Sequence, residues 1–131
     1  MRGYARGTVA MAGRERLICA ATALEEGGAG VRFDVERLGR RVPAFAVRYD
    51  GVVHGYLNQC AHVPVELDWA EGMFFDLSGL YLICATHGAT YLPETGRCVR
   101  GPCNGGGLKK LAVFERDGSV FISEQESLHG G

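Results

Sequence analysis

Two short motifs in the sequence each combine a cysteine with a histidine. The first is "CAH" at residues 60–62, and the second is "CATHG" at residues 84–88. In an extended segment, residues i and i+2 project to the same side, so Cys60 and His62 can face one object about 6 to 7 Å across. In a tight turn, residues i and i+3 approach to within about 7 Å, which does the same for Cys84 and His87. The motifs therefore predict one site with two thiolates and two imidazoles.

The way the donors are paired favours a metal cluster over a single ion. Zinc fingers usually take their cysteines as one close pair and their histidines as another. Here each close pair is mixed. Mixed pairs suit a binuclear cluster in which each metal takes one ligand from each motif. Gly88 directly follows the last donor, and without a Cβ it lets the backbone bend sharply or approach a bulky inorganic group.

Two other chemistries use the same residue types. Cys2His2 is a good tetrahedral set, so a structural zinc site is the main rival. A cysteine nucleophile with a histidine base, Cys84 with His87 or Cys60 with His62, also needs an orienting group and an oxyanion site. The sequence marks neither of these, and either nucleophile leaves the other Cys-His pair unexplained.

The elements that must position these motifs are short strands. Apolar and β-branched runs predict strands at residues 16–21, 31–35, 42–49, 52–57, 80–84, 108–114 and 119–123. Asp50-Gly51 and Asp117-Gly118 lie between such runs, where a tight hairpin turn needs positive φ. Helix is scarce, with a possible single turn at Thr22 to Glu26. These signals predict an all-β fold of mostly antiparallel strands.

Two segments do not follow the strand pattern, namely residues 58–79 and 85–107. Each begins at or next to one of the motifs, so we expect two long loops that carry the site on a rigid scaffold. Residues 1–13 and 124–131 are predicted to be tails, and residues 14–123 to form one domain. The N-terminal apolar run is better explained as a first strand than as a cleaved signal.

Composition excludes several classes of protein. The chain has 131 residues, 47% hydrophobic and 22% charged, with a net charge of -1, which fits one globular domain and not a polybasic nucleic-acid binder. No apolar run approaches the roughly 18 residues that a membrane span needs. Five cysteines do not suggest a secreted disulfide framework, so a cytoplasmic location is expected.

The two motifs closely resemble the signature of Rieske proteins, C-x-H followed at a distance by C-x-x-H-G. Here 21 residues separate His62 from Cys84. "TYLPETGRC" and "GPCNGGGLKKL" resemble that family's turn, proline loop and returning strand, so the likeness covers roughly residues 16–123. It implies stacked antiparallel sheets and one 2Fe-2S cluster per chain. By this resemblance Cys60 and Cys84 hold the inner iron and His62 and His87 the outer one, with the proline loop at 101–107 capping the cluster.

The resemblance also narrows the kind of Rieske protein. Members from quinol-oxidising complexes carry two extra cysteines that link the loops, whereas this chain has Val65 and Thr86 there. They also place a serine and a tyrosine after the second histidine, where this chain has Ala89 and Tyr91. Losing the serine should lower the potential, and the tyrosine should partly offset that.

We expect neither a membrane anchor nor a mononuclear iron domain in this chain. It is therefore most similar to a free-standing Rieske ferredoxin of the kind that serves bacterial ring-hydroxylating oxygenases. The resemblance implies an electron carrier that is not itself an enzyme, with a flavin reductase as donor and a terminal oxygenase as acceptor. An accessory or redox-sensing subunit is the alternative.

Several residues outside the motifs carry weaker expectations. Trp69, Phe74 and Phe75 in the first long loop either form an apolar docking rim or, as we favour, pack that loop onto the sheet. For Cys98 and Cys103 a packing role is preferred to a disulfide. The remaining candidate ligands are given structural interpretations: Cys19 as a core residue, His54 as a strand residue and His129 as a tail residue.

Overall fold

A computed structural model describes residues 15–61, 65–103 and 106–124. Nearly all regular structure in these ranges is antiparallel strand, as the sequence predicts. A four-stranded sheet has the order β2-β3-β4-β8, a second sheet the order β1-β10-β9, and a small third sheet the order β5-β6-β7. The strand bounds are β1 Glu15–Ala20, β2 Val31–Arg37, β3 Arg40–Tyr49, β4 Val52–Leu57, β5 Leu82–Ile83, β6 Thr90–Tyr91, β7 Cys98–Arg100, β8 Lys110–Leu111, β9 Val113–Arg116 and β10 Ser119–Ser123.

The predicted hairpin turns are present. Asp50 and Gly51 have φ of 54° and 77°, and Asp117 and Gly118 have φ of 52° and 78°. These paired positive values are what a two-residue turn between right-twisted antiparallel strands requires. Gly51 joins β3 to β4 and Gly118 joins β9 to β10, so the sequence correctly located two of the hairpins.

Three expectations about elements need correction. The run at 108–114 is divided into β8 and β9, because β8 pairs with β4 while β9 pairs with β10 in another sheet. The segment at 85–107 is not all loop, since it contains β6 and β7. These strands are too short for a period-two pattern to reveal them. The helical turn lies at Ala21–Ala23, slightly before the predicted position.

Strand β3 is the central wall of the molecule because both of its faces are buried. Ala44 and Ala46 face the core between the two larger sheets. Phe45 and Val47 face a separate core that contains Cys60, Cys84 and Tyr91. Successive side chains of a strand point to opposite faces, so alternate apolar residues of β3 pack into two different cores.

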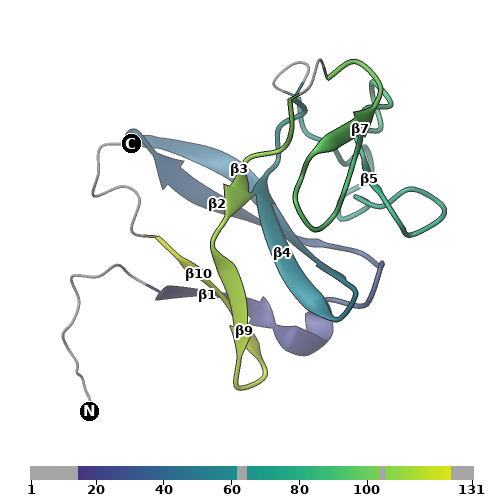
Figure 1. Cartoon of the computed structure of the whole chain (residues 1–131). Coiled ribbons are helices and arrows are strands. Elements are labelled where there is room, and N and C mark those ends of the chain that lie inside the picture. The colour runs from purple at the N-terminus through teal and green to yellow at the C-terminus, as the bar shows by residue number, and fades with distance from the viewer. Residues whose placement is uncertain (1–14, 62–64, 104–105, 125–131) are drawn as a thin grey trace, which may run out of the picture.

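The third sheet and the long loops form a lobe beside the two larger sheets. Figure 1 shows β5 and β7 at the upper right, apart from β1, β9 and β10 at the lower left. Phe74 fixes the base of this lobe, because its ring is fully buried and stacks on Phe45 with 3.9 Å between centroids. The lobe carries the candidate site. The predicted domain limits at residues 14 and 123 stay predictions.

Candidate metal centre

The second motif is held by a tight backbone turn that follows β5. Cys84 N–H donates to the Ala89 carbonyl at 2.9 Å, and Gly88 N–H donates to the Cys84 carbonyl at 2.8 Å. Gly88 has φ of 77°, a conformation that favours glycine. The turn brings the Cys84 Sγ to 3.8 Å from the His87 Nδ1. The predicted approach of residues i and i+3 is thus observed.

The first motif follows β4 and is held by a buried polar network. Asn58 is fully buried; its side-chain amide donates to Asp68 at 3.0 Å, and its side-chain oxygen accepts from Leu67 N–H at 2.8 Å. Asp68 also accepts from Gly72 N–H at 3.0 Å. Cys60 N–H donates to the Val65 carbonyl at 2.8 Å. These bonds tie both ends of the loop to the end of β4.

Three of the four predicted donors come together. The Sγ atoms of Cys60 and Cys84 and a ring nitrogen of His87 all lie within 4.8 Å of one another. Both cysteines are buried, with exposed fractions of 4% and 0%, whereas His87 is half-buried. The fourth predicted donor, His62, lies outside the described residues, and its assignment stays a prediction.

Tyr91 connects the two motifs. Its hydroxyl accepts from Ala61 N–H at 2.9 Å and lies 3.4 Å from the Cys60 Sγ. Burial raises the pKa of this hydroxyl, and the adjacent Cys60 adds to the shift. The hydroxyl therefore keeps its proton at neutral pH and can donate it toward the Cys60 sulfur. A further bond from Ala85 N–H to the Leu67 carbonyl, at 3.0 Å, fixes the loops to each other.

The donor set fits a cluster of positively charged metal ions. Burial is the main cause that raises the pKa of the Cys84 thiol, and the neighbouring Cys60 raises it further. Two buried sulfurs side by side do not both ionise unless a nearby positive charge compensates them. Ferric ions supply that charge, and thiolate with imidazole is the ligand combination of a 2Fe-2S centre with histidines on one iron.

The segment that the resemblance predicts as a proline loop packs against both motifs, and its Cys103 lies in one core cluster with Cys60 and Cys84. Gly101 has φ of 95°, and a Cβ there would lie 2.7 Å from the Ala89 Cα and 3.0 Å from the Gly88 carbonyl oxygen. A Cβ on Gly106 would lie 3.6 Å from the Ala61 Cβ. The close approach at Gly101, together with its positive φ, explains why that position of the predicted proline loop is glycine. The sequence indicated a capping loop by resemblance but not which glycine touches which motif.

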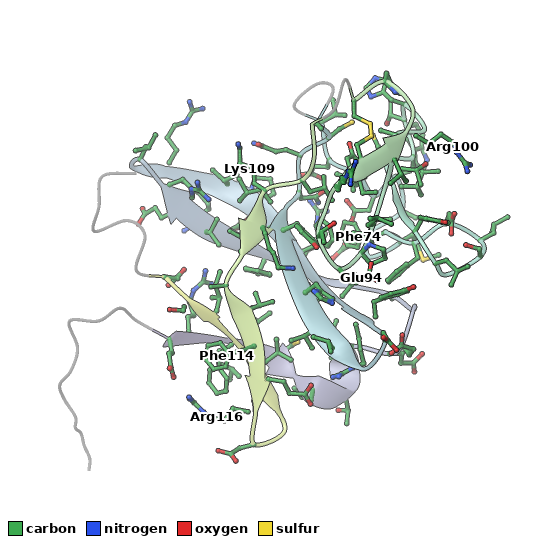
Figure 2. All side chains as sticks on the ribbon, in the orientation of Figure 1. Phe74, Glu94, Arg100, Lys109, Phe114 and Arg116 are labelled. Atoms are coloured by element: carbon green, nitrogen blue, oxygen red, sulfur yellow. A yellow bond between two sulfur atoms is a disulfide. The ribbon has the colours of Figure 1, made fainter. Side chains whose placement is uncertain are left out.

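Cys98 and Cys103 form a disulfide, with their Cα atoms 6.2 Å apart. Our preference for a packing role was therefore wrong. The physical reason is the reversal of the chain at Gly101, which the positive φ allows and which brings the two cysteines face to face. Figure 2 shows the bond in yellow beside β7.

The aromatic residues of the first long loop divide between the two interpretations. Phe74 is fully buried, and Phe75 is half-buried and stacks on Tyr49 with 6.3 Å between centroids. Both pack the loop onto the sheet, as favoured. Trp69 is 83% exposed and contributes little to that packing. His54 is a strand residue as predicted, whereas His129 lies outside the described residues.

Comparison with known proteins identifies the family. A family model described as the Rieske [2Fe-2S] domain matches residues 15–115. None of the curated protein sequences matches the chain significantly.

Solved structures similar to the chain include ferredoxins. One is a ferredoxin of Sphingomonas yanoikuyae B1, with a TM-score of 0.68 and 22% identity, covering 86% of this chain and 100% of that one. Another is the ferredoxin of carbazole 1,9a-dioxygenase from Nocardioides aromaticivorans IC177, with a TM-score of 0.67 and 21% identity, covering 85% and 98%. A third belongs to a complex of reduced oxygenase and oxidized ferredoxin in carbazole 1,9a-dioxygenase, with a TM-score of 0.65 and 22% identity, covering 85% and 94%. At these identities the likeness establishes the fold.

Proposed function

The chain belongs to the Rieske [2Fe-2S] domain family, and from that premise we propose that it is a single-electron carrier. The observation that carries the proposal is the arrangement of the donors. Two sulfurs are buried, and the one histidine donor in the described residues reaches the surface. When bound, the cluster supplies one-electron oxidation and reduction. An imidazole at the surface gives the electron a short path to a partner.

We assign the ligands residue by residue. Cys60 and Cys84 hold the inner iron, and His87 together with His62 holds the outer one. The burial of the cysteines and the half-exposure of His87 support this order. Neutral imidazoles lower the negative charge on the cluster, so the reduction potential lies within the roughly -150 to +300 mV range of Rieske centres. The absence of a serine at Ala89 places it toward the lower end.

The partners that fit this role are redox proteins. A flavin reductase is the proposed donor, and a terminal oxygenase of the ring-hydroxylating type is the proposed acceptor. Similar ferredoxins of carbazole 1,9a-dioxygenase, one of them in complex with its oxygenase, support the acceptor. Within the ranges that the structure describes, no helix is long and apolar enough to cross a membrane. We place the carrier in the cytoplasm, where such reductases have access to nicotinamide cofactors.

Protein-film voltammetry of the anaerobically purified chain tests the proposal. A reversible one-electron wave within the Rieske range is expected, together with electron transfer from the reduced protein to a Rieske oxygenase. A metal-loaded protein with no wave would instead indicate zinc, and the carrier role would be wrong. A wave without transfer to any oxygenase would keep the cluster but remove the proposed acceptor.

A further inference from the structure

The Cys98–Cys103 disulfide lies at the base of the segment that touches both motifs. Gly101 lies so close to the second motif that an added Cβ would meet the Gly88 carbonyl and the adjacent Ala89, and a Cβ on Gly106 would be in van der Waals contact with Ala61 of the first motif. Cys103 lies in one core cluster with Cys60 and Cys84. Gly101 lies within the stretch that the disulfide closes, and Gly106 follows that stretch. The segment therefore acts as a clamp across the two loops, defined here by residues 98, 101, 103 and 106.

Few other bonds hold the clamp in the described residues. Strand β7 pairs with β6 at one end, and Cys98 N–H donates to the Gly106 carbonyl at 3.1 Å. Within the clamp, Gly106 N–H donates to the Cys103 carbonyl at 2.7 Å and Cys103 N–H donates to the Gly101 carbonyl at 2.9 Å. All three of these bonds join clamp residues to one another, so the pairing of β7 with β6 is what ties the described clamp residues to the rest of the protein. The disulfide joins the Cys103 end of the clamp back to Cys98 in that paired strand.

The disulfide closes a very short stretch, with a sequence separation of 5. Loop-closure entropy grows with loop length, so such a bond stabilises the domain through the unfolded state less than a disulfide that closes a long loop. Its effect is local. Opening it frees the segment that packs against both motifs while leaving the sheets intact.

The two sulfurs differ in access. Cys98 is half-buried, whereas Cys103 is only 6% exposed and lies in the core cluster with Cys60 and Cys84. An incoming thiolate therefore reaches the Cys98 sulfur first, and Cys103 is the leaving group. Exchange through an accessible sulfur is the usual route by which disulfides open.

A hydrogen-bond acceptor lies close to both sulfurs. The Sγ atoms of Cys98 and Cys103 lie 3.3 and 3.4 Å from the Arg100 carbonyl oxygen. The two sulfurs are bonded in this structure and must move apart on reduction. The distances therefore show an acceptor within reach of both side chains, to which a freed thiol can donate after its side chain rotates.

We propose that Cys98 and Cys103 form a thiol-redox pair that fastens the clamp over the cluster, and that a dithiol reductant opens it. A thiolate of the reductant attacks the Cys98 Sγ, and the bond to Cys103 breaks. Cys103 leaves as a thiolate and takes up a proton. The second thiolate of the reductant then displaces Cys98, so that the protein gains two electrons and two protons and the reductant becomes a disulfide. The role at the cluster rests on the proposed function.

The test uses the whole metal-loaded chain in a series of dithiol to disulfide buffer ratios. At each ratio the thiols are trapped by alkylation and the peptide with Cys98 and Cys103 is weighed by mass spectrometry. A two-electron titration of this peptide is expected. In the reduced form, amide exchange at Cys103 and Gly106 should be at least tenfold faster, and a ferrous chelator should bleach the cluster several-fold faster.

Variants separate the clamp from general thiol effects. Cys98→Ser should give fast exchange and fast bleaching at every buffer ratio, whereas the matched Cys19→Ser should keep the dependence on the ratio. If both cysteines alkylate at every ratio, or if reduction changes neither exchange nor bleaching, the proposal is wrong. A zinc-bound or redox-silent protein would overturn the carrier role instead, because alkylation and amide exchange would still report on the pair.

Discussion

The two loops that carry the motifs are built by different means. The first is held by buried side chains, chiefly Asn58 and Asp68. The second is held by backbone bonds around Gly88 and by close packing of Gly101. The first loop therefore depends on buried polar side chains that all need hydrogen-bond partners. The second loop depends on glycines that leave room for closely packed backbone. Substitutions in each loop should therefore fail in different ways.

Loss of a proposed cluster ligand is the largest expected effect, because both loops serve to position the ligands. His87→Ala should abolish or convert the cluster, since the imidazole nitrogen near the Cys84 sulfur is lost. The visible absorption and circular dichroism spectra of the purified protein measure this. His62→Ala is expected to do the same.

The matched control for the histidines is His54→Ala, on a half-buried histidine of β4 outside the centre. Its spectrum should equal that of the unmodified protein. An unchanged spectrum in His87→Ala would remove His87 from the ligand set and leave the two cysteines without a described imidazole partner.

The side-chain network of the first loop is the next test. Asn58→Ala removes the acceptor for Leu67 N–H and the amide donor to the buried Asp68. Asp68 keeps the Gly72 N–H and, 3.7 Å away, the Arg32 guanidinium. The unpaired buried N–H of Leu67 and the bond lost at Asp68 should lower the free energy of unfolding by about 3 kcal/mol. Denaturant unfolding of the metal-loaded protein measures the change.

Ser78→Ala provides the comparison for that network. It removes two exposed bonds in the same loop, one of 2.6 Å from the Ser78 hydroxyl to Asp76 and one of 3.0 Å from Leu80 N–H to that hydroxyl. The expected cost is below about 0.5 kcal/mol. Equal costs for both variants would show that burial of the Asn58 network adds no stability, against the contrast drawn between the loops.

Close backbone packing is the corresponding test for the second loop. Gly101→Ala adds a Cβ at 2.7 Å from the Ala89 Cα and places alanine at φ of 95°. The expected loss is about 2 kcal/mol, with a changed cluster spectrum because the second motif must shift.

Gly39→Ala separates the two causes, since φ is 76° there and nothing lies within 4 Å of the added Cβ. It should cost about 1 kcal/mol for the strained backbone alone, without a spectral change. If Gly101→Ala proved as mild as Gly39→Ala, the clamp would not press on the second motif as the structure indicates.

The sequence predicted the metal-donor residues better than the residues and strands that hold them in position. Cys60, Cys84 and His87 stand out because thiol and imidazole at fixed spacing have few other uses, and the structure brings them together. Asn58 and Asp68 gave no signal, because polar residues are ordinary in loops and only burial makes theirs unusual. The two short strands β6 and β7 were missed for a related reason, since tertiary pairing and not local pattern creates them.

The smallest expected effect concerns the hydroxyl that joins the two loops. Tyr91→Phe removes the group that lies 3.4 Å from the Cys60 Sγ and accepts from Ala61 N–H. A donor to a ligand sulfur stabilises the more negative reduced cluster, so its loss should lower the potential. A change of about 1 kcal/mol corresponds to about 40 mV for one electron.

Tyr56→Phe is the matched control for Tyr91, because both rings are fully buried but the Tyr56 hydroxyl donates to the Pro93 carbonyl at 2.6 Å. Voltammetry should show no shift for Tyr56→Phe. Since the pKa of Tyr91 is raised by burial, its hydroxyl stays protonated from acidic to mildly alkaline pH, and the shift should be constant across that window. A shift shared by both variants would assign the effect to general loosening of the core and not to the bond that links the two loops.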